Sequence, residues 1–167
     1  SWMQSLMDSP LFDEVNGSSK AQLLYAAGFL VKEIGDVHQS RALFEDALKE
    51  AEKVEDESAK AYALLGLGEI AMNEHYMDEA RDYIDQSMEI FSRLEDDVGK
   101  LLAFADKGGI AADQEGYEKA EKYYEQNLAI CRKLGHQLGI AGTLLSLGRI
   151  GAYHGDCLLY TSPSPRD

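Results

Sequence analysis

Proline, cysteine and positive charge are all scarce in this chain of 167 residues. The three prolines lie outside residues 11–162, so no residue of the kind that breaks helices interrupts this long middle stretch. The two cysteines, Cys131 and Cys157, provide neither a disulfide framework nor the spacing of a metal site. No apolar run is long enough to cross a membrane, and no signal-peptide pattern opens the sequence. These absences favour a cytoplasmic protein without a metal.

Basic residues are outnumbered by acidic ones, 16 against 30, which gives a formal net charge of −14. A nucleic-acid-binding protein needs a basic stripe to neutralise phosphates, and no run of Lys and Arg occurs here. The same charge disfavours docking on an anionic membrane. The acidic balance is compatible with a basic partner, although a well-solvated surface is the simpler explanation.

A repeat of forty residues runs through most of the chain. Sliding the sequence against itself by that distance aligns four glycines without a gap, together with columns of apolar and small residues. The columns are Gly28, Gly68, Gly108 and Gly148; Leu24, Leu64, Phe104 and Leu144; Leu30, Ile70, Ile110 and Ile150; Ser40, Ala80 and Ala120; Phe44, Ile84 and Tyr124; Leu48, Met88 and Leu128; and Val54, Leu94 and Leu134. Such a register predicts stacked copies of one supersecondary unit.

Each unit is predicted to be a pair of helices, because apolar and small residues recur at helical spacing in both halves of a unit. Turns inside the units are expected at Gly35–Asp36, Glu115–Gly116 and Gly155–Asp156. The second unit has His75–Tyr76 there, so its turn is less strongly marked. Helix N-caps between units are expected at Asp56, Ser58, Asp96 and Asp97.

Glycine inside a helix costs about 1 kcal/mol relative to alanine, so a periodic glycine needs a periodic benefit. We expect the four glycines to let a neighbouring helix approach closely, opposite the small residues Ser40, Ala80 and Ala120. The aliphatic residue two places after each glycine is expected to fill the adjoining space.

The glycines are followed three places later by Val31, Ala71, Ala111 and Gly151, and two predicted second helices open with the phrases Tyr76-Met77-Asp78-Glu79-Ala80 and Gly116-Tyr117-Glu118-Lys119-Ala120. This pattern resembles the tetratricopeptide repeat, whose usual unit is about 34 residues long. The usual proline after the second helix and the aromatic early in the first helix are missing. HEAT repeats have a similar length, but their proline-bent first helix is not seen.

The resemblance implies an all-α, right-handed α-solenoid of antiparallel helix pairs, with about three and a half units. The expected organisation is 1–17 as the end of a preceding repeat (with a helix over 2–7) plus a connection, 18–57, 58–97 and 98–137 as complete units, 138–156 as the first helix of a fourth unit, and 157–167 as a non-native disordered tail. The tail resembles the translation of a transposon-end adapter used in preparing sequencing libraries. Bare solenoid ends would favour self-association.

Segments 87–96, 127–136, 138–141 and 26–30 resemble forty-residue repeats of large bacterial signalling regulators, including LuxR-type activators and some adenylate cyclases. This narrower resemblance implies a protein-interaction scaffold that serves as the sensor or docking arm of such a regulator. Two alternatives stay open: a repeat protein that senses a peptide or a small ligand, and a non-catalytic fragment of a multidomain enzyme such as a cyclase.

No catalytic site, metal site or cofactor site is predicted. The four histidines, His38, His75, His136 and His154, share no column, and Cys131 falls in a column of core residues. The glycines lie within helices rather than in a phosphate-binding loop after a strand.

By resemblance, the first helices of successive units line a concave face that binds a protein or peptide segment. This face would include Tyr25, Phe29, Tyr62, Glu69, Asn73, Asp106, Asp113, Arg149 and Tyr153. Its mixture of aromatic and acidic residues suits a segment that carries basic residues. Alternatively, some of the aromatic side chains simply pack between units.

Overall fold

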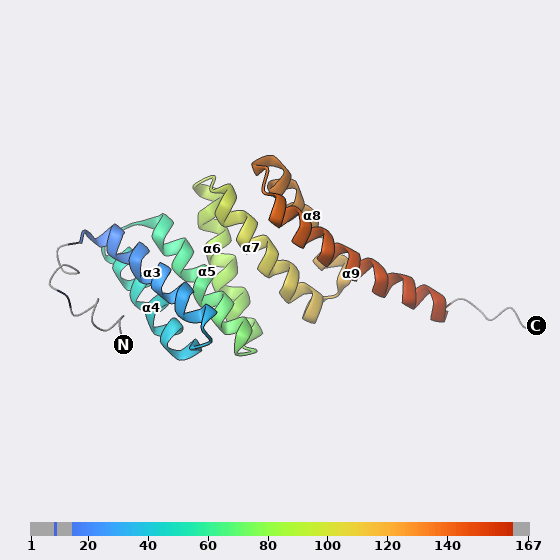
Figure 1. Ribbon diagram of the computed structural model, residues 1–167, viewed down its shortest axis with the longest axis horizontal. Coiled ribbons are helices and arrows are strands. Elements are labelled where there is room, and N and C mark those ends of the chain that lie inside the picture. The colour runs from blue at the N-terminus through green and yellow to red at the C-terminus, as the bar shows by residue number, and fades with distance from the viewer. Residues whose placement is uncertain (1–8, 10–14, 162–167) are drawn as a thin grey trace, which may run out of the picture. The chain divides into compact units, whose positions relative to one another are not determined.

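The computed structural model describes Ser9 and residues 15–161 (Figure 1), without the side chains of residues 115 and 154–161. The helix expected over residues 2–7 and the last six residues of the expected tail lie outside the described residues. Within the described part, the chain is entirely helical apart from short connections. The helices are α3 (Gly17–Glu33), α4 (Val37–Lys53), α5 (Glu57–Asn73), α6 (Met77–Arg93), α7 (Asp97–Ile110) with the π-helical turn η1 (Ala111–Glu115), α8 (Tyr117–Leu134) and α9 (Gln137–Thr161). The all-α helical repeat expected from the sequence is confirmed.

Regular connections set the repeat length. Successive α-helices begin at residues 17, 37, 57, 77, 97, 117 and 137, so each starts twenty residues after the one before. The first four helices have 17 residues each and are joined by three residues. Two helices and two connections therefore make the forty-residue unit.

The same hydrogen-bond pattern closes most of these helices. At the end of α3, the amide of Asp36 donates to the carbonyl of Val31 (3.2 Å) and the amide of Gly35 donates to that of Lys32 (3.0 Å). This is a Schellman motif, which needs a left-handed residue at its centre. Glycine supplies that residue at Gly35, whereas Glu55, His75 and Glu95 adopt the left-handed conformation at the corresponding positions.

The last residue of a connection also caps the next helix. Asp36 and Asp56 each accept a hydrogen bond from an amide of the first turn, and Asp96 accepts two. The predicted caps Asp56 and Asp96 are confirmed. Ser58 and Asp97 are not caps, because they already lie in the first turns of α5 and α7. Tyr76 occupies the same position without a side-chain cap, as expected for the weakly marked turn.

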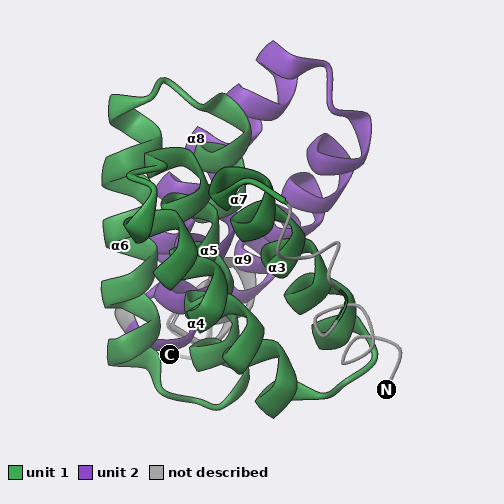
Figure 2. Cartoon of the chain, turned by 90° about the vertical axis from the view of Figure 1, so that its left-hand side faces the viewer, with its two compact units in different colours: residues 1–103 green, residues 104–167 purple. Residues whose placement is uncertain are grey.

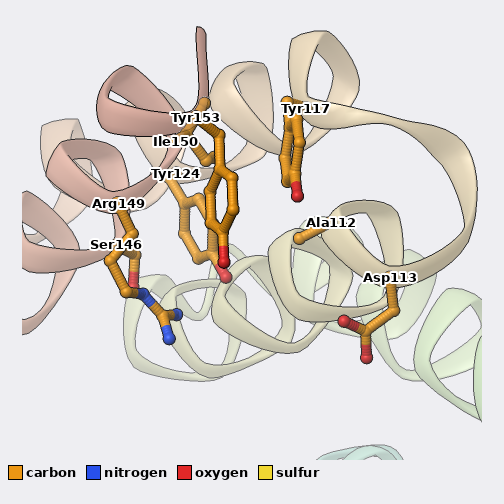
Figure 3. Close-up of a pocket in the computed structure, with 8 residues that line it drawn as sticks. All are labelled: Ala112, Asp113, Tyr117, Tyr124, Ser146, Arg149, Ile150 and Tyr153. Carbon is orange, nitrogen blue, oxygen red and sulfur yellow. The ribbon is translucent and has the colours of Figure 1, made fainter. Parts of the chain in front are cut away.

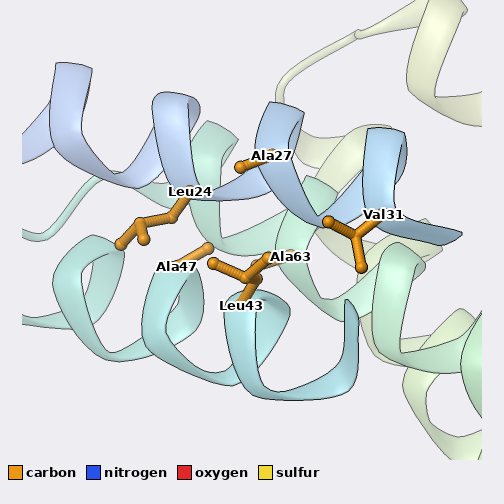
Figure 4. Close-up of a cluster of buried hydrophobic side chains, with 6 residues drawn as sticks. All are labelled: Leu24, Ala27, Val31, Leu43, Ala47 and Ala63. Carbon is orange, nitrogen blue, oxygen red and sulfur yellow. The ribbon is translucent and has the colours of Figure 1, made fainter. Parts of the chain in front are cut away.

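The chain forms two compact units, residues 1–103 and 104–167 (Figure 2). In the first unit, a buried cluster from α3, α4 and α5 lies where the three helices meet (Figure 4). Small residues such as Ala27, Ala47 and Ala63 in this cluster let the helix backbones approach closely, while Leu24 and Leu43 fill the space between them. The second unit has its own cluster, formed by Ala111, Ala120, Tyr124 and Ile150.

Three of the four aligned glycines are in tight contact with the second helix of their own pair. A Cβ atom at Gly28 would lie 2.8 Å from the ring of Phe44, and one at Gly68 would lie 2.6 Å from the side chain of Ile84. At Gly108 it would lie 2.5 Å from the ring of Tyr124. Real Cβ atoms do not come this close to their neighbours, so these positions require glycine.

The fourth unit and the first depart from the expected packing. Gly148 has open space where a side chain would be, because no second helix covers this face of α9 among the described residues. The aliphatic residues two places after the glycines are buried at Ile70, Ile110 and Ile150, but Leu30 is 56% exposed. The expectation for Leu30 was wrong. Its counterpart Ile70 is buried in a cluster with Phe44 of the preceding helix pair, and among the described residues no helix precedes α3 to cover Leu30 in the same way.

The turn expected at Gly155–Asp156 is wrong, because α9 continues through both residues to Thr161. The residues that follow, Cys-Leu-Leu-Tyr, include good helix formers, and the next proline is at position 163. No proline interrupts α9 before its end at Thr161, so nothing of that kind stops the helix at Gly155. The backbone of residues 157–161, which were expected to be a disordered tail, is therefore helical.

Alanine at two glycines of one column should have opposite effects on stability. Gly108→Ala should lower the free energy of unfolding by roughly 1–2 kcal/mol, because the clash with Tyr124 outweighs the gain in helix propensity. Gly148→Ala should raise the free energy of unfolding by up to about 1 kcal/mol. The added methyl group meets no neighbour there, so only the higher helix propensity of alanine contributes. Urea unfolding of both variants measures the difference. Equal effects would contradict a packing role for the column.

Candidate functional site

The nine residues predicted to face a partner all lie on the first helices of the pairs. The structure places them in two separate groups, one in each compact unit. The first unit contains Tyr25, Phe29, Tyr62, Glu69 and Asn73; the second contains Asp106, Asp113, Arg149 and Tyr153.

A row of packed rings runs through the first unit. The ring of Tyr62 lies 5.6 Å from that of Tyr25 and 4.9 Å from that of Phe91, between ring centroids. Tyr25 also contacts Phe44 at 5.6 Å. Both tyrosines are half-buried, so much of their surface serves packing between helices. Tyr25 and Tyr62 therefore serve in part to pack the helices, which is the alternative role considered for the aromatic residues of this face.

The hydroxyl group of Tyr62 links this row to a helix cap. It donates a hydrogen bond of 2.8 Å to Oδ2 of Asp96, whose Oδ1 caps α7. Burial raises the pKa of Tyr62 above its ordinary value, and the hydrogen bond to the Asp96 carboxylate raises it further. A small hollow of about 180 Å³ lies beside the ring, lined by Gln22, Tyr25, Ser58, Ala59 and Tyr62.

An ion pair joins α3 to α5 and neutralises two charged residues of the first unit. The ammonium group of Lys32 binds the carboxylate of Glu69 and lies 4.7 Å from the ring centroid of Phe29. The ring of Phe29 is 42% exposed, and Asn73 is exposed as well. In the first unit, Phe29 and Asn73 are thus the predicted residues most available to a partner.

The second unit has a cavity of about 190 Å³ between η1, the start of α8 and α9 (Figure 3). It brings together three predicted residues, Asp113, Arg149 and Tyr153. Sequence analysis missed the other residues that line it, which are Ala112, Tyr117, Tyr124, Ser146 and Ile150. The sequence placed Tyr117 at the opening of a second helix and Tyr124 in an aligned column of the repeat. It gave no sign that the two side chains line one cavity.

Tyrosine rings dominate this cavity. Tyr117 and Tyr153 stack nearly parallel, with centroids 5.2 Å apart and an angle of 11° between the rings. Tyr124 is buried, and burial raises the pKa of its phenol, while a hydrogen bond from Ser146 and the charge of Arg149 oppose the increase. The negative charges of Asp113 and Asp106 add to the increase. Asp106 is thus close enough to influence the cavity electrostatically, although it does not line it.

Two of the histidines, His75 and His136, serve local structure. Nδ1 of His136 accepts a hydrogen bond of 3.0 Å from the amide of Gly139, which caps α9. His75 is a left-handed connection residue. Cys131 is fully buried, as its column predicted. Among the described side chains, no group of three His, Cys, Asp or Glu residues could hold a metal ion. None of the described helices is long and apolar enough to span a membrane.

Fold and site together define a helical repeat module that presents residues from successive first helices. Residues 61–133 match the family model of the tetratricopeptide repeat. A solved structure of BtubC (BKLC) from P. vanneervenii is similar over 89% of this chain and 68% of its own, with a TM-score of 0.71 and 18% identity. The TPR domain of Arabidopsis FLU is similar over 70% of this chain and 98% of its own, with a TM-score of 0.63 and 20% identity. No curated protein matches the chain.

Removing the Tyr62 hydroxyl group should destabilise the fold in a pH-dependent way. At neutral pH, Tyr62→Phe should lower the free energy of unfolding by roughly 1 kcal/mol, because a hydrogen bond to a carboxylate is lost. The pKa of Tyr62 is raised in the folded state, so the unfolded chain ionises first as the pH rises past about 10. Wild-type stability should therefore fall there, and the difference from the variant should shrink.

Unfolding in urea at neutral and alkaline pH measures both effects, with Tyr76→Phe at an exposed tyrosine as the control. A difference that stays constant above pH 10 would contradict the assignment to the Tyr62 phenol.

Proposed function

We propose that this chain is a protein-interaction scaffold that binds a segment of a partner along the first helices of its pairs. Tetratricopeptide repeats are generally protein-interaction modules, which supports the role. The observation that carries the proposal is the accessibility of aromatic side chains on these helices, with Phe29 42% and Tyr153 56% exposed. Exposed aromatic residues are frequent anchors of protein interfaces.

The partner segment is proposed to be extended or helical and to carry basic residues. The net charge of −14 favours such a segment through long-range attraction. Asn73 supplies acceptor groups on the first helices of the first unit, and Asp106 and Asp113 do so in the second unit, whereas Glu69 is already paired with Lys32. Tyr25 and Tyr62 act there mainly as the packed support beneath it. The proposed setting is the cytoplasm, and no catalytic activity is assigned to the chain.

Screening an array of random peptides tests this function. The bound peptides should be enriched in Lys and Arg, and their affinity should fall with increasing salt. Phe29→Ala should weaken binding by about tenfold or more, as expected for an aromatic anchor. Tyr76→Ala removes an exposed aromatic residue from a connection and is the matched control. Selection of acidic peptides, or equal losses in the two variants, would refute the proposed face.

We also propose that the repeats form the sensor or docking arm of a larger bacterial regulator. The support is the resemblance of segments such as 87–96 and 127–136 to repeats of that class. Recovery of the surrounding gene tests it: an upstream P-loop motif, GxxxxGK[ST], is expected. A complete gene without a nucleotide-binding module would refute the proposal. The same DNA sequence decides whether residues 157–167 are native.

A further inference from the structure

One side of α9, which we call its open side, is apolar and faces solvent. Ala141 and Leu144 are exposed there, and a Cβ atom at Gly148 would meet no neighbour within 4 Å. The three positions are three and four residues apart, so they lie one above the other along the helix. Among the described residues, no helix covers this side of α9.

In the first unit, the corresponding side of a first helix is covered by its paired helix. Ala21, Leu24 and Gly28 of α3 stand three repeats, or 120 residues, before the three positions of the open side. Ala21 lies in a buried cluster with Ala51 of α4, and Leu24 lies in another cluster with residues of the same helix. Gly28 lies directly against the ring of Phe44. The open side of α9 is therefore the side that a second helix covers elsewhere in the chain.

The three second helices of the chain show what kind of helix such a side accepts. Each carries a small residue, a large residue four places later, and a small or compact polar residue three places after that. These triplets are Ser40, Phe44 and Ala47; Ala80, Ile84 and Ser87; and Ala120, Tyr124 and Asn127. All nine residues are buried, and the large residue of each triplet lies against the glycine of its own pair. The spacing i, i+4 and i+7 is that of an amphipathic helix docked in a groove.

We propose that the open side of α9 binds an amphipathic helix of a partner protein. That helix carries the same triplet, with its large apolar residue against Gly148 and its polar side toward solvent. The contact continues, in the same register, the interface already formed within each helix pair, so a helix fits this side better than an extended segment. A second copy of the chain does not offer a free helix of this kind, because its α4, α6 and α8 already pack against their own first helices.

This surface is separate from the face of the proposed function. Arg149 and Tyr153, which belong to that face, project about 100° and 140° away from Gly148 around the axis of α9.

Fluorescence anisotropy with a labelled synthetic peptide of the α4 sequence, residues 37–53, tests the proposal on the intact chain. This peptide supplies the triplet Ser40, Phe44 and Ala47 on one side of a 17-residue helix. Saturable binding of one peptide per chain is expected. The same peptide with Phe44→Ala should bind at least about tenfold more weakly, because the ring that covers the glycine is lost.

Variants of the chain locate the binding site. Gly148→Phe fills the open side with a ring and should weaken peptide binding by about tenfold or more. Gly142→Phe is the matched control, because a Cβ atom at Gly142 also meets no neighbour but projects about 120° away from Gly148. This control should bind the peptide like the wild type. Circular dichroism checks that both variants fold.

The proposal is overturned if the peptide does not bind, if its Phe44→Ala form binds equally well, or if the Gly148→Phe variant binds like the Gly142→Phe control. Dimerisation of the chain that Gly148→Phe abolishes would also overturn it, because a second copy would then occupy the open side. The test of the proposed function concerns Phe29 on α3, so either inference can fail without the other.

Discussion

The contact between an in-helix glycine and a large side chain of the paired helix is the constraint on which this fold depends. At Gly28, Gly68 and Gly108, the missing side chain is replaced by Phe44, Ile84 and Tyr124. The glycine lowers helix propensity, and the buried ring or aliphatic group restores stability through apolar burial and dispersion. The large residue differs among the three pairs, so its identity can vary while the contact with the glycine is kept.

That contact also positions the candidate sites. Tyr124 fills the space above Gly108 with one edge of its ring, and the same residue lines the cavity of the second unit. In the first unit, Phe44 lies against both Gly28 and Gly66, and it supports Tyr25. Packing residues on second helices thus support first-helix residues that we propose to face a partner.

The sequence predicted the periodic part of this protein well and the non-periodic part poorly. Spacing alone located the helix pairs, the caps Asp56 and Asp96 and the buried Cys131, because the same packing problem recurs every forty residues. It could not reveal that Tyr62 donates to Asp96 or that Tyr117 stacks on Tyr153, since these tyrosines have no counterpart at the aligned positions of the other units. It also placed a turn at Gly155–Asp156, because a local turn signal carries no information about whether a partner helix is there to stabilise the turn.

Each helix begins twenty residues after the beginning of the helix before it, and this constant spacing limits how such a chain can evolve. One residue inserted into a helix rotates everything after it by about 100° around the helix axis, which would turn a glycine away from its partner. Losses or gains of single residues are therefore tolerated only in the three-residue connections, where the left-handed residue and the cap leave little room. Length changes by duplication or deletion of whole forty-residue blocks avoid the problem altogether.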